Sequence, residues 1–400
     1  MIQMSDKTKC CGCTACANIC PAKAIFMEPD EEGFIYPKID ENRCVQCGLC
    51  EKVCPVLNRE HHEENTEGYI IRYKDERIVK ESTSGGAFTA FAIDLMSKGY
   101  VVYGAGYDSN MRVVCKMASK PEQLEEMRGS KFVQSFLGNT FQIIKKQLEA
   151  GEKVLFTGTP CQISGLISFL GSKPERLFCI DFVCRGVPSP GLWKNYVTMM
   201  EKKYNSKMVN ARFKHKTYGY HATTMKVDFA NGKTWYGSGR VDPMMKAFVN
   251  ELASRPSCHA CAFKGVERQS DITMFDCYEY SSITGQRDDN KGYTSIFIHT
   301  EKGKNLFDSI KHSIIVYPVS IEKLVTKNGI MVKNSAIANK NRNLFYNLIS
   351  TKPIDLAINM IDPITKKDVF IEMLKRICYR AKLIVILKKI RIKLLRKGQC

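Results

Sequence analysis

The chain has 400 residues, of which 44% are apolar and 10% aromatic, a composition that supports a sizeable core and excludes a disordered protein. At about 150 residues per domain it has room for two or three compact units. The net charge of +19 is concentrated at one end, because residues 366–400 hold twelve lysines and arginines against two acids, which is +10. The other residues show no basic stripe interleaved with aromatic side chains, which argues against nucleic-acid binding.

The start of the chain is polar, and no stretch approaches the roughly 18 apolar residues of a membrane span. We therefore expect a cytoplasmic protein. In a reducing compartment, eighteen cysteines indicate thiolate ligands to metal rather than disulfides.

Residues 1–58 contain two cysteine runs with the same spacing, C-x2-C-x2-C-x3-C-P. Two-cluster bacterial ferredoxins have this spacing, and the fourth cysteine of each of their runs binds the other cluster. The pattern predicts two [4Fe-4S] clusters, one on Cys10, Cys13, Cys16 and Cys54 and the other on Cys20, Cys44, Cys47 and Cys50. Two structural zinc sites of four thiolates each are the alternative. Cys11 lies outside the spacing and is interpreted as a bystander.

A polar linker, residues 59–67, leads into short apolar runs that alternate with helical periodicity, as in an α/β domain. The patterns predict, in chain order, a strand, a helix, a strand, a helix and a strand at residues 69–73, 85–98, 100–107, 136–150 and 153–156. A further strand and helix are expected at 177–183 and 192–204. After about residue 208 the runs are shorter and suggest strands of a mixed sheet, at 225–229, 233–236, 271–275 and 294–299.

Four more cysteines lie in loop-like settings of this region: Cys161, Cys184, Cys258 and Cys261. A Cys-x2-Cys pair with two distant partners suits a third four-thiolate site, and scattered core cysteines are the alternative. Ser84, Gly85 and Gly86 open a predicted helix and could offer N–H groups to a phosphate, with Lys131 as counter-charge. Ordinary helix capping explains the same residues. No dinucleotide or P-loop fingerprint is present.

Five segments taken in order resemble the coenzyme F420 hydrogenase/dehydrogenase beta-subunit family, many members of which carry a fused two-cluster ferredoxin. They are STSGGAF (82–88), GSKFVQS (129–135), GTPCQ (158–162), DFVCRGVPSP (181–190) and RPSCHAC (255–261) with SDIT (270–273). The resemblance covers residues 68–320 and implies FAD with a third [4Fe-4S] cluster on Cys161, Cys184, Cys258 and Cys261. It also implies that FAD contacts Ser84, Gly85, Gly86, Gly129, Ser130, Lys131, Gly158, Thr159, Pro160 and Lys214.

Lys216 belongs with Lys214 in the segment that the resemblance places near the flavin, and solvated strand lysines are the alternative. Two departures from the family pattern leave the substrate open: Arg185 follows Cys184 where members commonly have histidine, and Phe275-Asp276 stands where they often have Gly-Asp.

The expected fold is an α/β domain whose mixed sheet holds flavin and iron-sulfur groups, residues 68–350. It is preceded by an α+β bacterial-ferredoxin-like domain, residues 1–58, and followed by a basic amphipathic helical tail, residues 351–400. The spacing of apolar residues among the lysines of 366–400 favours a helix on an anionic membrane, and packing on its own domain is the alternative.

FAD accepts two electrons as a hydride and iron-sulfur clusters take one at a time, so this combination predicts a two-to-one electron converter. Its partners would be a small hydride donor, such as an F420-like deazaflavin, and a redox protein. A ferredoxin-driven reductase of a small metabolite and a flavin-free relay subunit are the alternatives. The seven histidines form no ligand spacing and receive no catalytic role.

Overall fold

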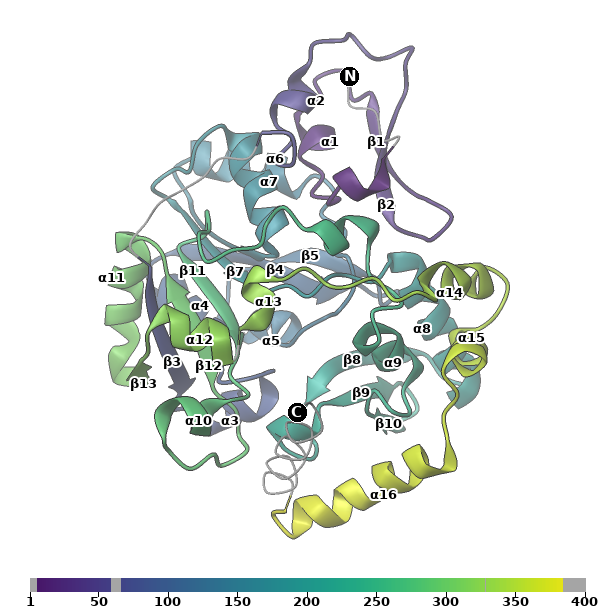
Figure 1. Ribbon diagram of the computed structural model, residues 1–400. Coiled ribbons are helices and arrows are strands. Elements are labelled where there is room, and N and C mark those ends of the chain that lie inside the picture. The colour runs from purple at the N-terminus through teal and green to yellow at the C-terminus, as the bar shows by residue number, and fades with distance from the viewer. Residues whose placement is uncertain (1–5, 59–65, 328, 384–400) are drawn as a thin grey trace.

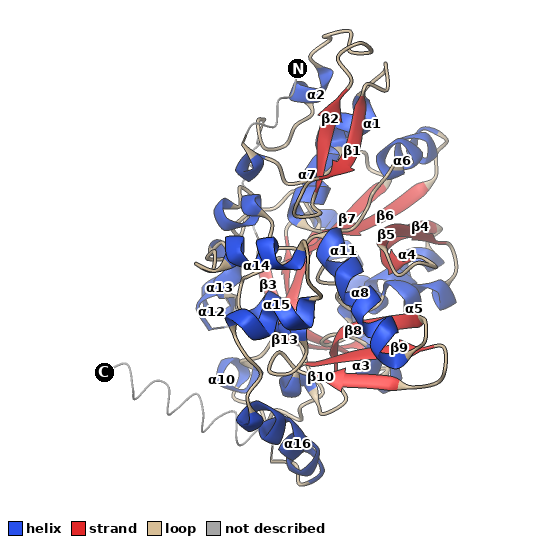
Figure 2. Cartoon of the chain, turned by 90° about the vertical axis from the view of Figure 1, so that its right-hand side faces the viewer, coloured by secondary structure: helices blue, strands red, loops and turns tan. Residues whose placement is uncertain are grey.

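Figure 1 shows a computed structural model of the chain, in which residues 6–58, 66–327 and 329–383 are described. Most of the expected linker lies outside the described residues. The N-terminal module occupies one end, an eight-stranded sheet forms the body, and a small sheet with the C-terminal helices lies at the other end, as the perpendicular view in Figure 2 also shows.

The module has the expected α+β character. It begins with a 3-10 turn, Lys7–Lys9, and contains α1 (Ala15–Ile19), β1 (Ile25–Pro29), β2 (Ile35–Ile39) and α2 (Leu49–Lys52), with β1 and β2 antiparallel. Asp30 shapes the turn of the β1–β2 hairpin, because its Oδ1 accepts from the backbone N–H groups of Glu32 and Phe34. The turn thereby carries Phe34 into the body of the protein, where its side chain is fully buried.

The central sheet has the strand order β13-β3-β12-β11-β7-β6-β4-β5. β3, β4, β6, β7 and β11 point the same way, whereas β5, β12 and β13 run antiparallel to their neighbours. The carboxyl ends of the five co-directional strands therefore meet at one edge, where open α/β sheets bind ligands. The strands are β3 (Glu67–Tyr73), β4 (Tyr100–Tyr107), β5 (Val113–Ala118), β6 (Lys153–Gly158), β7 (Leu177–Phe182), β11 (Ile272–Asp276), β12 (Thr294–Ile298) and β13 (Ile314–Pro318).

Helices cover both faces of this sheet. On one face α4 (Ala87–Ser97) and α11 (Glu301–Ile310) bury Phe91 and Phe307, and on the other α6 (Thr140–Glu149) and α7 (Pro160–Leu170) bury Phe141 and Leu166. Cys13 and Val53 of the module belong to the second of these cores. Shorter helices are α3 (Glu76–Glu81), α5 (Leu124–Met127), α10 (Tyr280–Thr284), α12 (Ile321–Lys327) and α13 (Ile330–Lys333).

The runs after residue 208 do not all join one sheet, which corrects the sequence interpretation. β8 (Met208–His215), β9 (Thr224–Phe229) and β10 (Thr234–Gly237) form a separate antiparallel sheet, whereas β11, β12 and β13 belong to the central one. The reason is that Phe213 and Val227 of the small sheet bury against Trp193 and the C-terminal helices. The helices that share a core with the small sheet are α8 (Pro190–Tyr204), α9 (Pro243–Val249), α14 (Arg342–Ile349) and α15 (Ile354–Ile361).

The helix expected from residue 136 begins at Thr140. Phe136 is extended instead, because its N–H donates to the Val113 carbonyl at 2.8 Å and its carbonyl accepts from Cys115 N–H at 2.9 Å. Phe136 thus pairs with β5, a strand that the sequence analysis did not predict.

The range 351–400 has two different parts. α15 lies in it but is anchored in the core, where Ile354 and Ile358 are fully buried. The basic helix follows as α16 (Lys366–Arg380), which Thr365 caps by accepting from Asp368 N–H, and residues 384–400 lie outside the described part of the chain. No helix among the described residues is long and apolar enough to cross a bilayer.

Candidate functional site

The eight cysteines of the two runs line two hollows in the module. The inner hollow is lined by Cys10, Cys13, Cys16 and Cys54, and the outer hollow by Cys20, Cys44, Cys47 and Cys50. Each run thus sends its fourth cysteine to the other run's hollow, and these are the two sets that the spacing predicts. Among the described residues no three His, Cys, Asp or Glu side chains converge on a single metal-ion position.

The inner thiols suit an iron-sulfur cluster because they lie close together and are shielded from solvent. Burial raises the pKa of Cys16 to about 12, and the neighbouring thiols of Cys10 and Cys54 add to this effect. Burial also raises the pKa of Cys10. Such thiols are held neutral, and a metal cluster that binds the thiolates would release their protons. In the outer hollow the Cys47 side chain is exposed, and Cys20 Sγ accepts from Ala24 N–H at 3.3 Å.

The third predicted cysteine set lies at the carboxyl edge of the central sheet. Cys161 is in the first turn of α7, directly after β6, and Thr159 Oγ1 lies 3.0 Å from its Sγ. Cys184 follows β7. Cys258 lies in the 3-10 helix Pro256–Ala260, and Cys261 is the residue that ends it.

The four thiols of this set lie within electrostatic reach of one another. Burial raises the pKa of Cys184 to about 12, and the thiols of Cys161 and Cys261 contribute to this rise. The pKa of Cys258 is raised by burial and then by Cys184, Cys161 and Cys261. The absence of a side chain at Gly186 leaves room for Cys258, because a Cβ added to Gly186 would lie 3.3 Å from Cys258 Cβ. The geometry fits a third cluster, whose ligands remain a prediction.

The inner hollow and the third set meet directly. The Cys11 thiol lies close enough to Cys161 to be, ahead of burial, the main cause of the raised pKa of Cys161. Cys13 packs on α7, where a Cβ placed on Gly165 would lie 2.7 Å from Cys13 Cβ and 2.9 Å from its Sγ. Only a glycine allows so close an approach. Cys11, which spacing alone marked as a bystander, therefore lies between the two cysteine sets.

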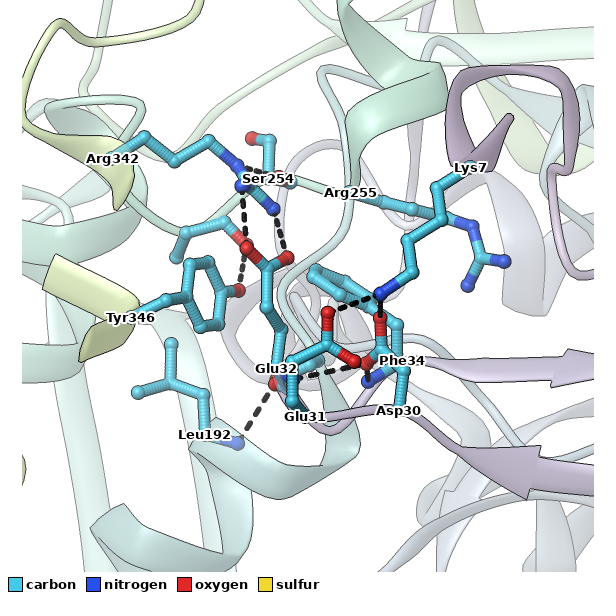
Figure 3. Close-up of polar contacts among 12 residues, drawn as sticks. Lys7, Asp30, Glu31, Glu32, Phe34, Leu192, Ser254, Arg255, Arg342 and Tyr346 are labelled. Atoms are coloured by element: carbon cyan, nitrogen blue, oxygen red, sulfur yellow. Dashed lines mark hydrogen bonds and ion pairs between the residues drawn. The ribbon is translucent and has the colours of Figure 1, made fainter. Parts of the chain in front are cut away.

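Charged and polar contacts fix the module in this position (Figure 3). Arg342 donates to both carboxylate oxygens of Glu32, at 2.8 and 2.5 Å, and Nε of Arg342 donates to the Ser254 carbonyl at 2.8 Å. The hairpin turn also approaches the start of α8, where a Cβ on Gly33 would lie 2.5 Å from Gly191 Cα. A separately moving ferredoxin unit would not bury an ion pair of this kind, so the module is an integral part of the site.

The segments predicted to contact FAD lie along the same sheet edge. Gly85 N–H and Ser84 Oγ contact Thr294 Oγ1, both at 2.9 Å, and Thr83 Oγ1 accepts from Ser130 N–H at 3.1 Å, which brings the two glycine turns together. Gly129 has a φ of +89° and little around its α-carbon, since the nearest atom to an added Cβ is 3.9 Å away. Gly158, Thr159 and Pro160 begin α7 at the carboxyl end of β6. The open space at Gly129 allows close backbone approach, which fits a phosphate-bearing cofactor, whereas a Cβ added to Gly85 would meet the Ile71 carbonyl oxygen at 2.7 Å.

Lys131 is engaged by the protein itself. Its Nζ donates to the carbonyl oxygens of Glu126 at 2.9 Å and Arg128 at 3.3 Å, and burial lowers its pKa to about 7. The predicted role as a phosphate counter-charge therefore requires Lys131 to leave these carbonyls.

Lys214 and Lys216 are half-buried and both have protein partners, which argues against freely solvated strand lysines. Lys214 forms an ion pair with Asp276 at the end of β11; although burial acts against the charge, this carboxylate raises the pKa of Lys214. Tyr220 OH donates to the other Asp276 oxygen at 3.3 Å. Lys216 Nζ donates to the Ser84 carbonyl at 2.5 Å, and burial lowers its pKa to about 7.

Two parts of one known family match most of the large domain. Residues 69–140 match the N-terminal part of the coenzyme F420 hydrogenase/dehydrogenase beta subunit, and residues 151–323 match its C terminus. The two matches together span more than half of the chain. The chain belongs to this family. Residues 9–58 in addition match a 4Fe-4S dicluster domain.

Membership in the F420 hydrogenase/dehydrogenase beta-subunit family, with the dicluster match, makes the chain an iron-sulfur oxidoreductase component with a relay of 4Fe-4S clusters. Among solved structures, a chain of the F420-reducing [NiFe] hydrogenase complex from Methanosarcina barkeri is similar, with 17% identity and a TM-score of 0.43 over 76% of this chain and 94% of that one. No curated protein sequence matches.

Some residues of this family member's site were missed by sequence reasoning. Thr294 organises the Ser84–Gly85 turn from a strand that is distant in the sequence, and Glu32 and Arg342 hold the module although 310 residues separate them. Asp276 was named only as the residue after the departure from the family pattern at Phe275, yet this carboxylate is the partner of Lys214. A charged residue at the end of a buried strand was the signal that could have identified it.

Proposed function

We propose that the chain is an iron-sulfur flavoprotein that exchanges a hydride between FAD and a small molecule and passes single electrons through three [4Fe-4S] clusters to or from a redox protein. The observation that carries this proposal is the continuous succession of cysteine sets. It runs from the outer hollow through the inner hollow and the Cys11–Cys161 contact to the carboxyl edge of the sheet.

The FAD would contact the glycine turns around Gly85, Gly129 and Gly158, and it supplies the change between two-electron hydride transfer and one-electron transfer. The protein's own part is to bind and exclude water. Ser84 and Ser130 sit in turns that can approach phosphate oxygens, and Thr159 orients the start of α7 beside Cys161.

The small-molecule side of the site would involve the buried group at the end of β11. Asp276 contacts Lys214 and Tyr220 there, and the Tyr278 ring lies 5.3 Å from Lys214 Nζ and stacks on the Tyr220 ring. A charged lysine paired with a carboxylate and flanked by phenol groups can hold an anionic or carbonyl-bearing molecule and keep a proton near it. A deazaflavin such as coenzyme F420, or another small hydride donor or acceptor, fits this chemistry.

The redox protein would dock at the outer hollow. Cys47 is exposed there and Val45 beside it is 66% exposed, whereas Cys13 and Cys16 of the inner hollow are buried. Electron exchange with a partner favours the cluster with the shortest path to the surface, so we assign the exchange to the outer set.

One observation favours a second candidate, a relay subunit without flavin. Lys131 and Lys214 both already have protein partners, as they would if no cofactor came to displace them. A reductase of a small metabolite driven by reduced ferredoxin uses the same path in reverse and differs from the leading proposal only in direction.

Quantitation of iron, sulfide and flavin after anaerobic purification tests the proposal. We expect about twelve irons and one FAD per chain, and about eight irons without flavin would establish the relay subunit instead. The Cys161→Ala variant should retain FAD, lose about four irons and lose reduction of a dye by the hydride donor. Cys179→Ala is the matched control, since Cys179 is a buried cysteine of β7 outside the three sets. Unchanged flavin-to-cluster transfer in Cys161→Ala would contradict the path.

We also propose that α16 contacts an anionic membrane surface. One face of the helix is attached to the body, where Glu372 accepts from Ser238 Oγ at 2.6 Å and Lys375 Nζ donates to the Ala222 carbonyl at 3.4 Å. At about 100° per residue, Phe370, Met373 and Ile377 lie on the opposite face, and all three are at least 60% exposed. Leu374, a further apolar residue of this helix, is half-buried.

Charge supports lipid as the occupant of this face, because residues 366–400 carry a net charge of +10. The triple variant Phe370→Ser, Met373→Ser and Ile377→Ser should lose sedimentation with vesicles of phosphatidylserine and phosphatidylcholine, as should truncation before Lys366. Val209→Ser with Leu344→Ser replaces exposed apolar residues elsewhere and should bind normally. Binding that is insensitive to salt, or equal for the truncated chain, would refute the contact.

A further inference from the structure

Arg255 is a fully buried charged side chain at the interface between the module and the large domain. It precedes the 3-10 helix that carries Cys258 and reaches back to the inner hollow. Its Nε donates to the Cys10 carbonyl at 2.7 Å, and its Nη1 donates to the Ile35 carbonyl at 3.1 Å and to Gln134 Oε1 at 3.0 Å. These contacts fix the guanidinium beside the first cysteine of the inner set.

The charge of Arg255 has no counter-charge in the described part of the chain. No carboxylate there forms an ion pair with it, and its Nη2 is buried without a hydrogen-bond partner. The Tyr36 ring lies 3.9 Å from the guanidinium carbon and gives a cation–π contact, which replaces only part of the lost hydration. A buried guanidinium without an anion is strongly unfavourable, so this arrangement points to an anionic group that completes it.

The inner cysteine set is where that anion would be bound. Nη1 of Arg255 lies 3.1 Å from the position of a Cβ on Gly12, within the loop between Cys10 and Cys13. A cluster held by four thiolates is an anion, and it becomes more negative by one unit on reduction.

We propose that Arg255 is the counter-charge of the inner cluster and sets its reduction potential above the value that the same ligands would otherwise give. This inference rests on the proposed function. A nearby positive charge and hydrogen bonds to cluster sulfurs favour the reduced state. Reduction adds one electron, supplied by the neighbouring cluster or by dithionite in a titration, and no proton moves because the guanidinium stays charged. Arg255 is a positioning residue, because it acts on the inner cluster through its charge and is not itself a ligand.

Anaerobic potentiometric titration of the full cluster-loaded chain, followed by electron paramagnetic resonance, tests this role. Arg255→Gln should shift one module potential negative by about 59 mV, a tenfold change in a one-electron equilibrium, and leave the other in place. Arg255→Lys keeps the positive charge and should therefore keep the potential close to that of the wild-type chain. Arg43→Gln is the matched control, because Arg43 belongs to the same module but lies on its surface in a pair with Asp40.

Gln134→Glu provides an independent test if Arg255→Gln does not retain its clusters. The new carboxylate keeps the acceptor of Nη1 and of Ile35 N–H and offsets the guanidinium charge, so the same potential should shift negative. Full cluster content with unmoved potentials in both variants would overturn the role of Arg255, and so would an equal shift of all clusters. Absence of cluster signals from the wild-type chain would instead overturn the proposed function.

Discussion

The two hollows of the N-terminal module come from nearly identical sequence runs but lie in different surroundings. The inner hollow is pressed on α7 and the start of the 3-10 helix, with Cys13 and Cys16 buried and Arg255 beside it. The outer hollow opens toward solvent, where Cys47 and Val45 are exposed. Equal ligand spacing therefore produces two sites that differ in solvation and charge, the quantities that set cluster potentials. The cysteine runs therefore determine the cluster ligands, whereas contacts with the large domain determine the solvation and charge around each cluster.

Removal of one cysteine ligand from each hollow should cause the largest changes in iron content and stability. Cys13→Ala should lose about four irons and also destabilise the packing on α7, because Cys13 contributes to the core there. Cys47→Ala should lose a similar amount of iron but keep the melting temperature of the large domain, since Cys47 is exposed. Iron analysis and thermal unfolding of both variants measure this, and equal losses of stability would show that the two hollows are structurally equivalent.

Breaking the Glu32–Arg342 pair should have the next largest effect. Glu32→Ala leaves the buried guanidinium of Arg342 with no carboxylate, and we expect a loss of about 3–5 kcal/mol in the free energy of unfolding. Urea denaturation measures it. Glu28→Ala is the control on the same hairpin, since its pair with Lys38 is exposed and should contribute about 0–1 kcal/mol. A small effect of Glu32→Ala would mean that the module is not held by this contact.

Gly165→Ala should have the smallest effect of the three. The added methyl group would meet Cys13 at 2.7 Å, and overpacking costs about 1–3 kcal/mol, from which a gain of roughly 1 kcal/mol in helix propensity is subtracted. Ser168→Ala on the same helix, at a half-buried position, is the control. Stability measured with and without the iron-sulfur clusters would locate the strain, which should be confined to the inner hollow. An outer-cluster signal that changes in Gly165→Ala would contradict that assignment.

Features that depend on neighbouring residues were predicted well from the sequence. The periodic cysteine runs predicted which residues line each hollow, and the match to the dicluster domain confirms the iron-sulfur character of residues 9–58. The strands of the central sheet were mostly expected because buried strands carry short apolar runs.

Contacts between distant segments were not accessible in this way. The hairpin turn at Phe34 has ordinary turn chemistry, and nothing in its residues indicates that it inserts beside Tyr346. From the sequence, Arg255 would be taken for a surface arginine beside a proline. It is buried because it contacts three segments that are distant in the sequence, at Cys10, Ile35 and Gln134. Phe136 likewise fits a helical pattern, and pairing with β5 overrides that preference.

The Glu32–Arg342 contact also has a consequence for the order of folding. It closes a separation of 310 residues, and contacts between such distant segments form late because the intervening chain must first become ordered. Residues 1–58 leave the ribosome long before Arg342 does, at about 5–20 residues per second. We therefore expect an interval in which the module is folded but not yet docked, and in which the inner hollow is open to the machinery that inserts clusters.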